Sequence, residues 1–597
     1  MRLNCARIGS GGAVAVLAVA VVSSASMLAS ASRSNAQASG GTALEAACTP
    51  ENVQSAVSGL SVRVTIKPTV NVMPRPATRY VAASGKSPAF CQVTGTYVTN
   101  PATGKTANFI ATLPEGWNGK YLQLGCSSHC GQFFVSDPAV AAVTVTAQGY
   151  PNQIIEKGYA TFATDQGHEG LESASWALRD GRVDQDYLDD FYFRASKVLS
   201  TMGKQFTRAF YGRLNGSEQR ISRAYFQGCS GGGRDAMVAS SYFPEAFDGI
   251  IAGSPYNPIG VMLQASAIKA AASRSPDAGL TPQHLALFDL TVKAQCDGLD
   301  GARDGLIQNP AACNFVAERD LPRCPAGSPV GQCFSPAQIE TISVITSAVT
   351  DERGNVVQPA YSVSELAGVS DMLSGLAEPG LKIMVHRNEP GFDPAKLFRF
   401  HRGGPGNVTA FHAVVSASEV AKVRDALRLG AGHLRENTST LMRSKTKLMV
   451  WHNFSDELLT PYISVNWYKQ LARDHGGYAS VQRQARLFML PGTTHCSITS
   501  VGPNAFDPLT AMENWVERGV APDALPAWVA DRQYTPGAPK APVLARLDYT
   551  MPLCKFPEMA RYSGRGDMKD GRNWTCRPGD TGLLRVGATG KQAGVLR

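Results

Sequence analysis

The chain has 597 residues, of which 44% are hydrophobic and 18% are charged. These values are typical of a globular protein and exclude a disordered chain, and the length allows a large core and more than one domain. The formal net charge of +9 is spread along the sequence without a dense block of Lys and Arg, which argues against nucleic acid as a partner.

The first 38 residues have the pattern of a signal peptide. A positively charged start precedes the apolar run Gly11 to Val22, and Ala36-Gln37-Ala38 matches a cleavage site, with Ala29-Ser30-Ala31 as a second candidate. The apolar run is short for a membrane span, and later stretches are not long and apolar enough either. We therefore expect a periplasmic or secreted protein without a membrane segment, and an uncleaved anchor is the alternative.

The cysteine content agrees with export. The sequence has 13 cysteines, and Cys5 lies in the expected signal peptide. The other 12 form an even set, as expected for disulfides in an oxidising compartment, and they lack the paired C-x2-C spacing of zinc sites.

The chain after the signal peptide begins with small and polar residues, and we expect 39–60 to be flexible. Alternating apolar and polar residues then predict strands at 61–66 and 90–98, and Cys48 and Cys91 are placed to pin this arm. A short strand at 121–124 runs into Gly125-Cys126-Ser127-Ser128-His129-Cys130-Gly131. A ring closed by Cys126 and Cys130 would stiffen this loop.

The segment 221–242 predicts the fold class. A strand-like lead-in is followed by Gly228-Cys229-Ser230-Gly231-Gly232 and then by a helix-like run from Asp235 to Tyr242. The match to G-x-S-x-G predicts a nucleophile elbow, a sharp turn that strains the serine backbone and needs neighbours without Cβ. A buried strand at 249–253 completes a βαβ unit. We therefore expect an α/β-hydrolase with a mostly parallel sheet.

Regular alternation of strands and helices is lost from Ser254 to about Ser444 and resumes at 447–451. We expect 254–444 to be a large inserted lid domain, and 39–253 with 445–597 to be the catalytic domain. Phenylalanines and arginines interleave at 392–411, which suits either an aromatic pocket wall that tolerates anions or a lid core with solvated arginines. The tail past Pro536 is expected to be irregular.

Chain order selects an acid and a base for the serine, because α/β-hydrolases use the order serine, acid, histidine. Asp456 follows the strand at 447–451, and His495 follows the next strand, at 486–490. Ser230 is a weak nucleophile until His495 takes its proton, and Asp456 would hold the imidazole tautomer. We therefore predict Ser230, Asp456 and His495 as the catalytic residues.

Other residues compete for these roles. His168 precedes the serine, so we expect it in a hydrogen-bonded turn near the site, and His475 lies in a polar turn. Glu457 is expected to point elsewhere. The amide of Gly231 is one predicted oxyanion donor, and the loop after the early strand supplies the other, which we assign to Ser127. The alternative is that this loop is only a tight disulfide turn.

Two cysteines flank the predicted catalytic residues. Cys229 precedes Ser230 and Cys496 follows His495. If nucleophile and base meet, a disulfide between these cysteines would close a very long loop and stabilise the fold by about 3–5 kcal/mol.

A second site is predicted in the insertion. Asp297, Asp300 and Asp304 are interleaved with glycines, and such an oxygen-rich loop suits a hard cation such as Ca²⁺. The loop is not an EF-hand, because the twelfth position is Gln308 rather than Glu. The alternative is a solvated acidic turn.

Five motifs together resemble the tannase and feruloyl esterase family of α/β-hydrolases, which includes mono(2-hydroxyethyl) terephthalate hydrolases. They are Gly228-Cys229-Ser230-x-Gly232-Gly233, Trp451-His452-x-x-x-Asp456, Gly492-x-x-His495-Cys496, Thr164-Asp165-x-Gly167-His168 and the acidic loop. The chain differs from the family at Cys126-Ser127-Ser128-His129, where glycines are usual, and after Cys496, where it reads Ser497-Ile498-Thr499. Both departures concern substrate preference more than hydrolysis.

The resemblance implies further assignments. Structural calcium would be held by the side chains of Asp297, Asp300 and Asp304 and by the carbonyls of Ala302 and Leu306. The insertion would be the lid that specifies the substrate. The implied disulfides are Cys48–Cys91, Cys296–Cys313, Cys324–Cys333 and Cys554–Cys576, which leaves Cys126 and Cys130 to pair locally.

The resemblance thus implies an exported serine esterase that acts on small aromatic esters through an acyl-enzyme. Esters of gallate, hydroxycinnamates such as ferulate, or terephthalate monoesters are the implied substrates. An esterase of non-aromatic esters and a catalytically silent, calcium-stabilised binding protein are the alternatives.

Overall fold

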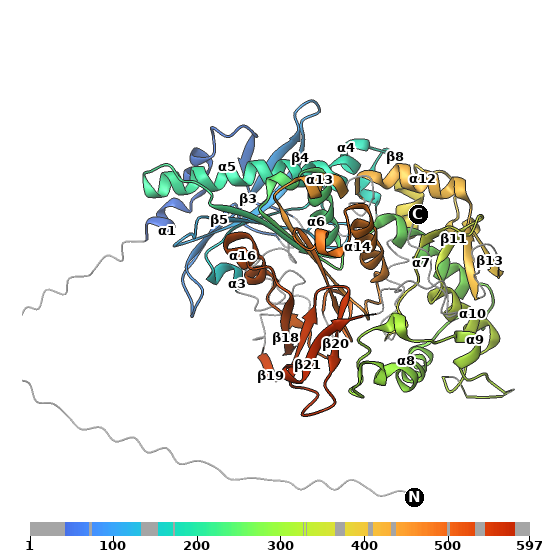
Figure 1. Ribbon diagram of the computed structural model, residues 1–597. Coiled ribbons are helices and arrows are strands. Elements are labelled where there is room, and N and C mark those ends of the chain that lie inside the picture. Colours follow the sequence, from blue (N-terminus) through green and yellow to red (C-terminus); the bar gives the residue numbers. More distant parts are fainter. Residues whose placement is uncertain are drawn as a thin grey trace, which may run out of the picture. The chain divides into compact units, whose positions relative to one another are not determined.

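The protein is described from a computed structural model (Figure 1). The described residues are 42–70, 74–132, 153–170, 174–325, 327–329, 331–364, 377–403, 410–430, 438–497, 502–531 and 544–579. The expected signal peptide, 1–38, lies outside them.

A ten-stranded sheet organises the chain and contains the predicted βαβ unit (Figure 1). Across the sheet the order is β1 (Val64–Ile66), β3 (Phe90–Asn100), β4 (Lys105–Pro114), β6 (Ala160–Thr164), β5 (Lys120–Leu124), β9 (Arg223–Cys229), β10 (Gly249–Gly253), β15 (Lys447–Asn453) and β16 (Ala485–Leu490), and β2 (Thr78–Val81) pairs with β3. From β6 to β16 all neighbours are parallel, while β1 to β4 are antiparallel and pair with β6 through β4. The predicted mostly parallel sheet is confirmed.

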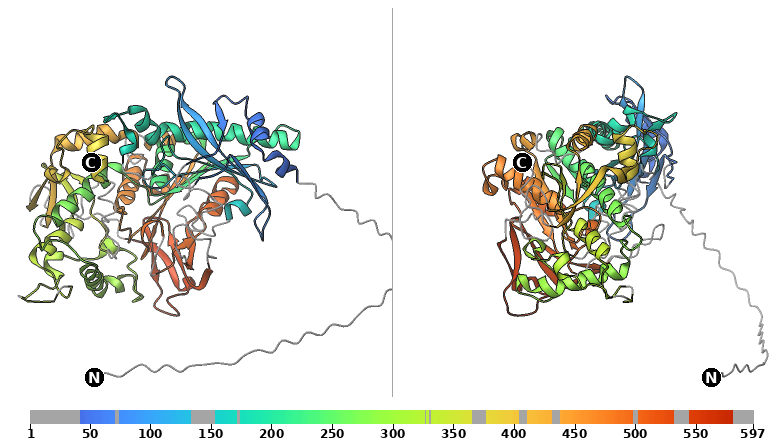
Figure 2. Two further views of the ribbon diagram at one scale, coloured as in Figure 1. Left: turned by 180° about the vertical axis from the view of Figure 1, so that it is seen from behind. Right: turned by 90° about the vertical axis from the view of Figure 1, so that its right-hand side faces the viewer.

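The strands are buried on both faces, as the continuous apolar runs require. Successive residues alternate between two hydrophobic clusters: Phe226 and Ile250 belong to one cluster, and their neighbours Tyr225 and Ile251 belong to the other. The first cluster contains residues of α5 (Ala195–Asn215), α6 (Gly231–Tyr242) and α14 (Tyr462–Asp474). The second contains residues of α3 (Gln153–Glu156) and α16 (Pro508–Arg518). Helices therefore cover both faces, and Figure 2 gives two further views of this arrangement.

The insertion between β10 and β15 has a sheet of its own. Its four strands run in the order β12 (Val356–Gln358), β11 (Val349–Asp351), β14 (Phe411–Val415) and β13 (Phe398–Arg402). The helices of the insertion are α7 (Pro258–Ala272), α8 (Pro282–Cys296), α9 (Ala317–Asp320), α10 (Pro336–Ile345), α12 (Ala417–Leu427) and α13 (Thr438–Arg443). The insertion belongs to the same compact unit as the catalytic part, and its function as a lid stays a prediction.

The phenylalanines at 398–411 belong to the core of the insertion. Phe398 and Phe411 are buried, and Phe400 stacks on Phe411 with ring centroids 5.8 Å apart. Arg402 pairs with Glu340 at 2.9 Å and has an exposed side chain. Of the two interpretations, these contacts favour packing in the core of the insertion over a pocket wall.

The two ends of the described chain are more ordered than expected. Residues 43–56 form α1 (Ala43–Ala47) and α2 (Pro50–Ala56), and the Thr49 side chain caps α2. After α16, strands continue with β17 (Ala505–Phe506), β18 (Ala524–Asp531), β19 (Leu544–Cys554), β20 (Glu558–Tyr562) and β21 (Trp574–Pro578). The expectations of a flexible start and an irregular tail were therefore wrong for these residues. Smaller elements are β7 (Leu178–Arg179), β8 (Arg182–Val183), α4 (Gln185–Asp189) and α15 (Tyr478–Val481).

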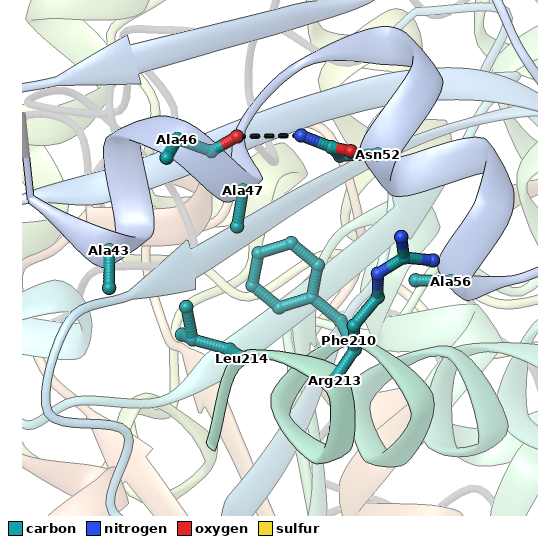
Figure 3. A pocket seen from close by; sticks show the side chains of 8 residues that line it. All are labelled: Ala43, Ala46, Ala47, Asn52, Ala56, Phe210, Arg213 and Leu214. Carbon is teal, nitrogen blue, oxygen red and sulfur yellow. Dashed lines mark hydrogen bonds between the residues drawn. The ribbon is translucent and has the colours of Figure 1, made fainter. Parts of the chain in front are cut away.

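A cavity of about 330 Å³ lies between the N-terminal helices and α5 (Figure 3). Its lining residues are Ala43, Ala46, Ala47, Asn52, Ala56, Phe210, Arg213 and Leu214. Because the lining comes from α1, α2 and the C-terminal end of α5, and from none of the loops that carry the predicted catalytic residues, this cavity is separate from the site described below.

All six predicted disulfides are present. They are Cys48–Cys91, Cys126–Cys130, Cys229–Cys496, Cys296–Cys313, Cys324–Cys333 and Cys554–Cys576. Among the residues that the structure describes, no helix is long and apolar enough to cross a membrane.

The contact between β1 and β3 gives a stability prediction. A Cβ at Gly95 would collide with the carbonyl oxygen of Thr65 and lie 3.0 Å from a ring carbon of Phe109. We expect Gly95→Ala to lower the free energy of unfolding by about 1–3 kcal/mol, because strand backbones cannot yield cheaply. Gly279→Ala is the control, since nothing lies within 4 Å of its Cβ. Urea denaturation measures both, and equal midpoints would contradict the prediction.

Candidate active site

Six parallel strands bring the candidate residues to one edge of the sheet. The carboxyl ends of β5, β6, β9, β10, β15 and β16 meet there, as in other open α/β sheets. Ten non-glycine residues of the described chain have a positive φ, and six of them lie in loops at this edge: Ser128, Cys130, Gln166, Ser230, Ser254 and Cys496. Such strained backbone concentrates at functional sites.

Ser230 occupies the predicted sharp turn between β9 and α6. Its backbone has φ 63° and ψ −121°. Its N–H donates to the carbonyl oxygen of Gly253 at 3.0 Å, and its own carbonyl accepts from the amide of Tyr256 at 3.0 Å. The side chain is half-buried among buried neighbours. Backbone hydrogen bonds from two directions thus fix the unusual conformation.

The glycines around Ser230 allow backbones to touch. A Cβ at Gly232 would lie 2.9 Å from the carbonyl oxygen of Cys126, and one at Gly228 would lie 2.6 Å from the carbonyl carbon of Gly232. A Cβ at Gly231 would collide with the carbonyl oxygen of Ser128. The first turn of α6 therefore rests directly on the loop after β5, which contains Ser127.

Asp456 and His495 form a buried pair. His495 Nδ1 donates to Asp456 Oδ2 at 2.8 Å. Asp456 Oδ1 accepts from the amides of Leu458 and Leu459 at 3.1 and 2.7 Å, and His452 Nε2 lies 3.3 Å from Oδ2. Burial alone would raise the pKa of Asp456, but the charges and hydrogen bonds of His495 and His452 outweigh it and lower that pKa, so the carboxylate stays ionised.

The same attraction acts on the imidazole. Burial alone would lower the pKa of His495, but the charge and the hydrogen bond of Asp456 outweigh it and raise that pKa. The charge of Glu457 acts in the same direction. Glu457 Oε2 also accepts a hydrogen bond from the backbone N–H of His495 at 2.9 Å. The sequence interpretation missed this contact, and the only signal for it was the adjacency of two acids.

A disulfide joins the serine turn to the histidine loop. Cys229 and Cys496 are bonded, with their Cα atoms 6.1 Å apart, although 267 positions separate them. Cys496 Sγ lies 3.5 Å from His495 Nε2. The predicted link between the two segments is confirmed, and it holds the residues next to Ser230 and His495 at one place.

A buried polar network supports the turn, and the sequence interpretation did not identify it. Arg234 and Asp235 follow the elbow on α6; Arg234 Nη2 donates to Asp235 Oδ1 at 2.7 Å and to Gln166 Oε1 at 2.9 Å. Asp235 Oδ2 accepts from Gln166 Nε2 at 2.6 Å. Burial raises the pKa of Asp235. The sequence signal for this network was the charged pair itself, and the structure buries it on the first turn of α6.

The remaining histidines of interest have structural contacts. His168 stacks on Trp176 at 3.8 Å, and its Nε2 donates to the carbonyl oxygen of His129 at 2.8 Å. Burial lowers the pKa of His168 to about 3, so the ring is neutral. These contacts agree with the predicted hydrogen-bonded turn. His475 Nε2 lies 3.4 Å from Thr438 Oγ1, at the end of α14.

The acidic loop lies after α8. Asp300 Oδ2 is buried and has no hydrogen-bond partner among the described residues, and Asp304 Oδ2 is buried beside the Tyr549 hydroxyl. Burial raises the pKa of Asp300 to about 7, and the charges of Asp304 and Asp297 add to this effect. In the described ranges no three His, Cys, Asp or Glu side chains gather as a metal-binding group. Cation binding here therefore remains a proposal.

Comparison with known proteins identifies the family of this chain. Residues 91–577 match the model of the family described as "Tannase and feruloyl esterase". The chain belongs to the tannase and feruloyl esterase family. The α/β-hydrolase fold expected from the sequence agrees with this membership.

Relatives match along most of their length. A probable feruloyl esterase from Arthroderma benhamiae is 27% identical, over 78% of this chain and 81% of its own. A mono(2-hydroxyethyl) terephthalate hydrolase from Piscinibacter sakaiensis is also 27% identical, over 84% of this chain and 87% of its own.

Solved structures that share the fold include two fungal enzymes. Feruloyl esterase B from Aspergillus oryzae has a TM-score of 0.68 at 23% identity, covering 88% of this chain and 100% of its own. Tannin acyl hydrolase from Aspergillus niger has a TM-score of 0.62 at 20% identity, covering 90% and 96%.

The Asp456–His495 pair gives a prediction that can be measured without a substrate. Asp456→Asn removes the charge that raises the pKa of His495, so burial dominates and this pKa falls below its ordinary value of about 6.5. Glu457→Gln is the matched comparison and should lower the pKa less, because its charge acts more weakly on the ring. NMR titration with labelled histidine checks both, and an unchanged His495 pKa in Asp456→Asn would contradict the prediction.

Proposed function

We propose that this protein is an exported serine esterase that hydrolyses carboxylic esters of aromatic acids, with Ser230 as nucleophile, His495 as base and Asp456 as its partner. The observation that carries the proposal is the buried Asp456–His495 pair, linked through Cys229–Cys496 to the strained turn of Ser230. A nucleophile, a base and an orienting acid are the parts that acyl transfer needs.

Acylation follows from these positions. Ser230 Oγ attacks the ester carbonyl carbon while His495 Nε2 takes the hydroxyl proton, and Asp456 stabilises the imidazolium. The carbonyl oxygen becomes an oxyanion, which receives hydrogen bonds from the amides of Gly231 and Ser127. The intermediate then expels the alcohol, which takes the proton from His495, and leaves an acyl-enzyme.

Deacylation repeats the sequence with water. His495 takes a proton from the water molecule as its oxygen attacks the acyl carbon. The second intermediate releases the acid, and the proton returns to Ser230 Oγ. His495 must be neutral for both steps, so activity rises with pH through the raised pKa of His495.

The substrate class rests on the family. The names of the relatives specify a feruloyl esterase and a terephthalate monoester hydrolase, and one structural neighbour is a tannin acyl hydrolase. We therefore include gallate, ferulate and terephthalate monoesters in the proposed substrates. Export to the periplasm or the medium is supported by the six disulfides and by the signal-peptide pattern at 1–38.

Replacement of the serine tests the proposal. Ser230→Ala should abolish labelling by a fluorophosphonate and reduce hydrolysis at least about 10³-fold, because the nucleophile is gone. Ser241→Ala on the same helix is the control, since its hydroxyl donates to the carbonyl oxygen of Met237 within that helix. Gallate, ferulate and mono-terephthalate esters are assayed beside short aliphatic esters. Faster turnover of the aliphatic esters would overturn the substrate class, and an active Ser230→Ala would overturn the nucleophile.

We also propose that the acidic loop binds Ca²⁺. The buried oxygens of Asp300 and Asp304 are the hard oxygen ligands that this ion prefers, and Asp300 Oδ2 has no partner among the described residues, so the donor set fits. Asp297, Asp300 and Asp304 would hold the ion with the carbonyls of Ala302 and Leu306. The ion would neutralise three neighbouring carboxylates that otherwise repel each other.

Chelation tests this assignment. EDTA should lower the melting temperature and added Ca²⁺ should restore it, since a ligand at 100 times its dissociation constant stabilises the folded state by about 2.7 kcal/mol. Asp300→Asn should remove most of the calcium response. Asp277→Asn should keep it, because Asp277 is an exposed aspartate of the same insertion. Calcium titration without any thermal shift in the unaltered protein would refute the site.

A further inference from the structure

The loop after β5 is closed by a disulfide next to the serine turn. Cys126 and Cys130 are bonded, with their Cα atoms 5.5 Å apart and a separation of only four positions in the sequence. The amide of Cys130 donates to the carbonyl oxygen of Ser127 at 2.9 Å, so a hydrogen bond crosses the same ring. The disulfide and the hydrogen bond thus enclose Ser127 and Ser128 in a tight turn.

Two residues of this ring have a backbone that L-amino acids avoid. Ser128 has φ 56° and Cys130 has φ 65°. Glycine adopts this region freely, whereas in residues with a Cβ it raises the conformational energy. A loop with these two residues therefore needs an external constraint to keep its shape, and the disulfide is a covalent one.

The shape of the ring matters because α6 rests on it. The carbonyl oxygen of Ser128 occupies the place where a Cβ on Gly231 would lie, and the carbonyl carbon of Ser127 is 3.1 Å from that point. Ser127, Ser128 and Ser230 are half-buried, whereas Cys126, Cys130 and Gly231 are buried. Ser127, Ser128 and Ser230 therefore all keep partial exposure to solvent beside the buried contact at Gly231.

We infer that the Cys126–Cys130 disulfide is a positioning element of the oxyanion hole, which holds the left-handed backbone of Ser128 and Cys130 so that the Ser127 amide stays aligned with the Gly231 amide. The inference rests on the proposed esterase function. The two cysteines do not touch the substrate, and their effect passes through the backbone. It should therefore appear in binding of the transition state and not in binding of the substrate.

The test combines removal of the disulfide with relief of the strain. In Cys126→Ala/Cys130→Ala we expect kcat to fall about 10- to 100-fold while KM changes less than about 3-fold, since misplacing one oxyanion donor costs at most 10²–10³. Glycine at the strained positions should restore activity without a disulfide. We expect the order of kcat to be unaltered enzyme, then Cys126→Ala/Ser128→Gly/Cys130→Gly, then Cys126→Ala/Cys130→Gly, then the double alanine variant.

The control is Cys324→Ala/Cys333→Ala, which opens another short disulfide ring, in the insertion. It should keep kcat even if the melting temperature falls. A tetrahedral boronate should lose affinity in parallel with kcat/KM, whereas the carboxylic acid product should bind equally well to all variants.

Three outcomes would overturn the inference. They are an unchanged kcat in the double alanine variant, equal losses of boronate and product affinity, and no recovery with glycine. If the double alanine variant does not fold, the two glycine variants still decide, because the inference requires the triple variant to be faster than Cys126→Ala/Cys130→Gly. Absence of esterase activity and of fluorophosphonate labelling in the unaltered protein would instead refute the proposed function itself.

Discussion

The site depends on one close contact, that between the first turn of α6 and the backbone of the loop after β5. Gly231 and Gly232 lie against the carbonyl oxygens of Ser128 and Cys126 at distances that leave no room for a side chain. This contact sets the position of the amides that follow Ser230. It also explains why strained residues collect at this edge of the sheet, since backbones that approach so closely cannot all adopt relaxed conformations. The surrounding disulfides and the Arg234–Asp235–Gln166 network then hold the arrangement.

Much of the fold and of the site follows from local sequence. Continuous apolar strands, the glycines of the elbow and the order of Ser230, Asp456 and His495 are local patterns with a physical cause, and the structure places them at one sheet edge. The disulfide between Cys229 and Cys496 was predictable because both cysteines adjoin residues that chemistry requires to meet. In these cases, the residues that show the sequence pattern are the same residues that make the tertiary contacts.

The remaining features depend on contacts between distant segments. The strands after Pro536 are held by Cys554–Cys576, which the family resemblance implied, and by the pairing of β18 with β19, which local composition does not indicate. Glu457 was identified only as a neighbour of Asp456, because its hydrogen bond to the His495 amide depends on how two loops fold together. The N-terminal helices are a different case. Thr49 and Pro50 are an N-cap and a first helical residue, so a signal was present and the small, polar composition masked it.

The carboxylates around His495 impose opposing demands. In the mechanism that we propose, Asp456 fixes the tautomer of His495 and stabilises the imidazolium, and both effects assist proton transfer. The same negative charge, with that of Glu457, raises the pKa of His495 and so keeps the ring protonated to a higher pH. A protonated His495 cannot accept the serine proton, so stronger stabilisation of the charged intermediate moves the active range to higher pH. Burial opposes this shift because it disfavours the imidazolium. In that mechanism, the balance between burial and two carboxylates sets the pH at which Ser230 can act as a nucleophile. Glu457 accepts a hydrogen bond from the backbone of His495 and not from its ring, so it adjusts that balance without competing for the imidazole.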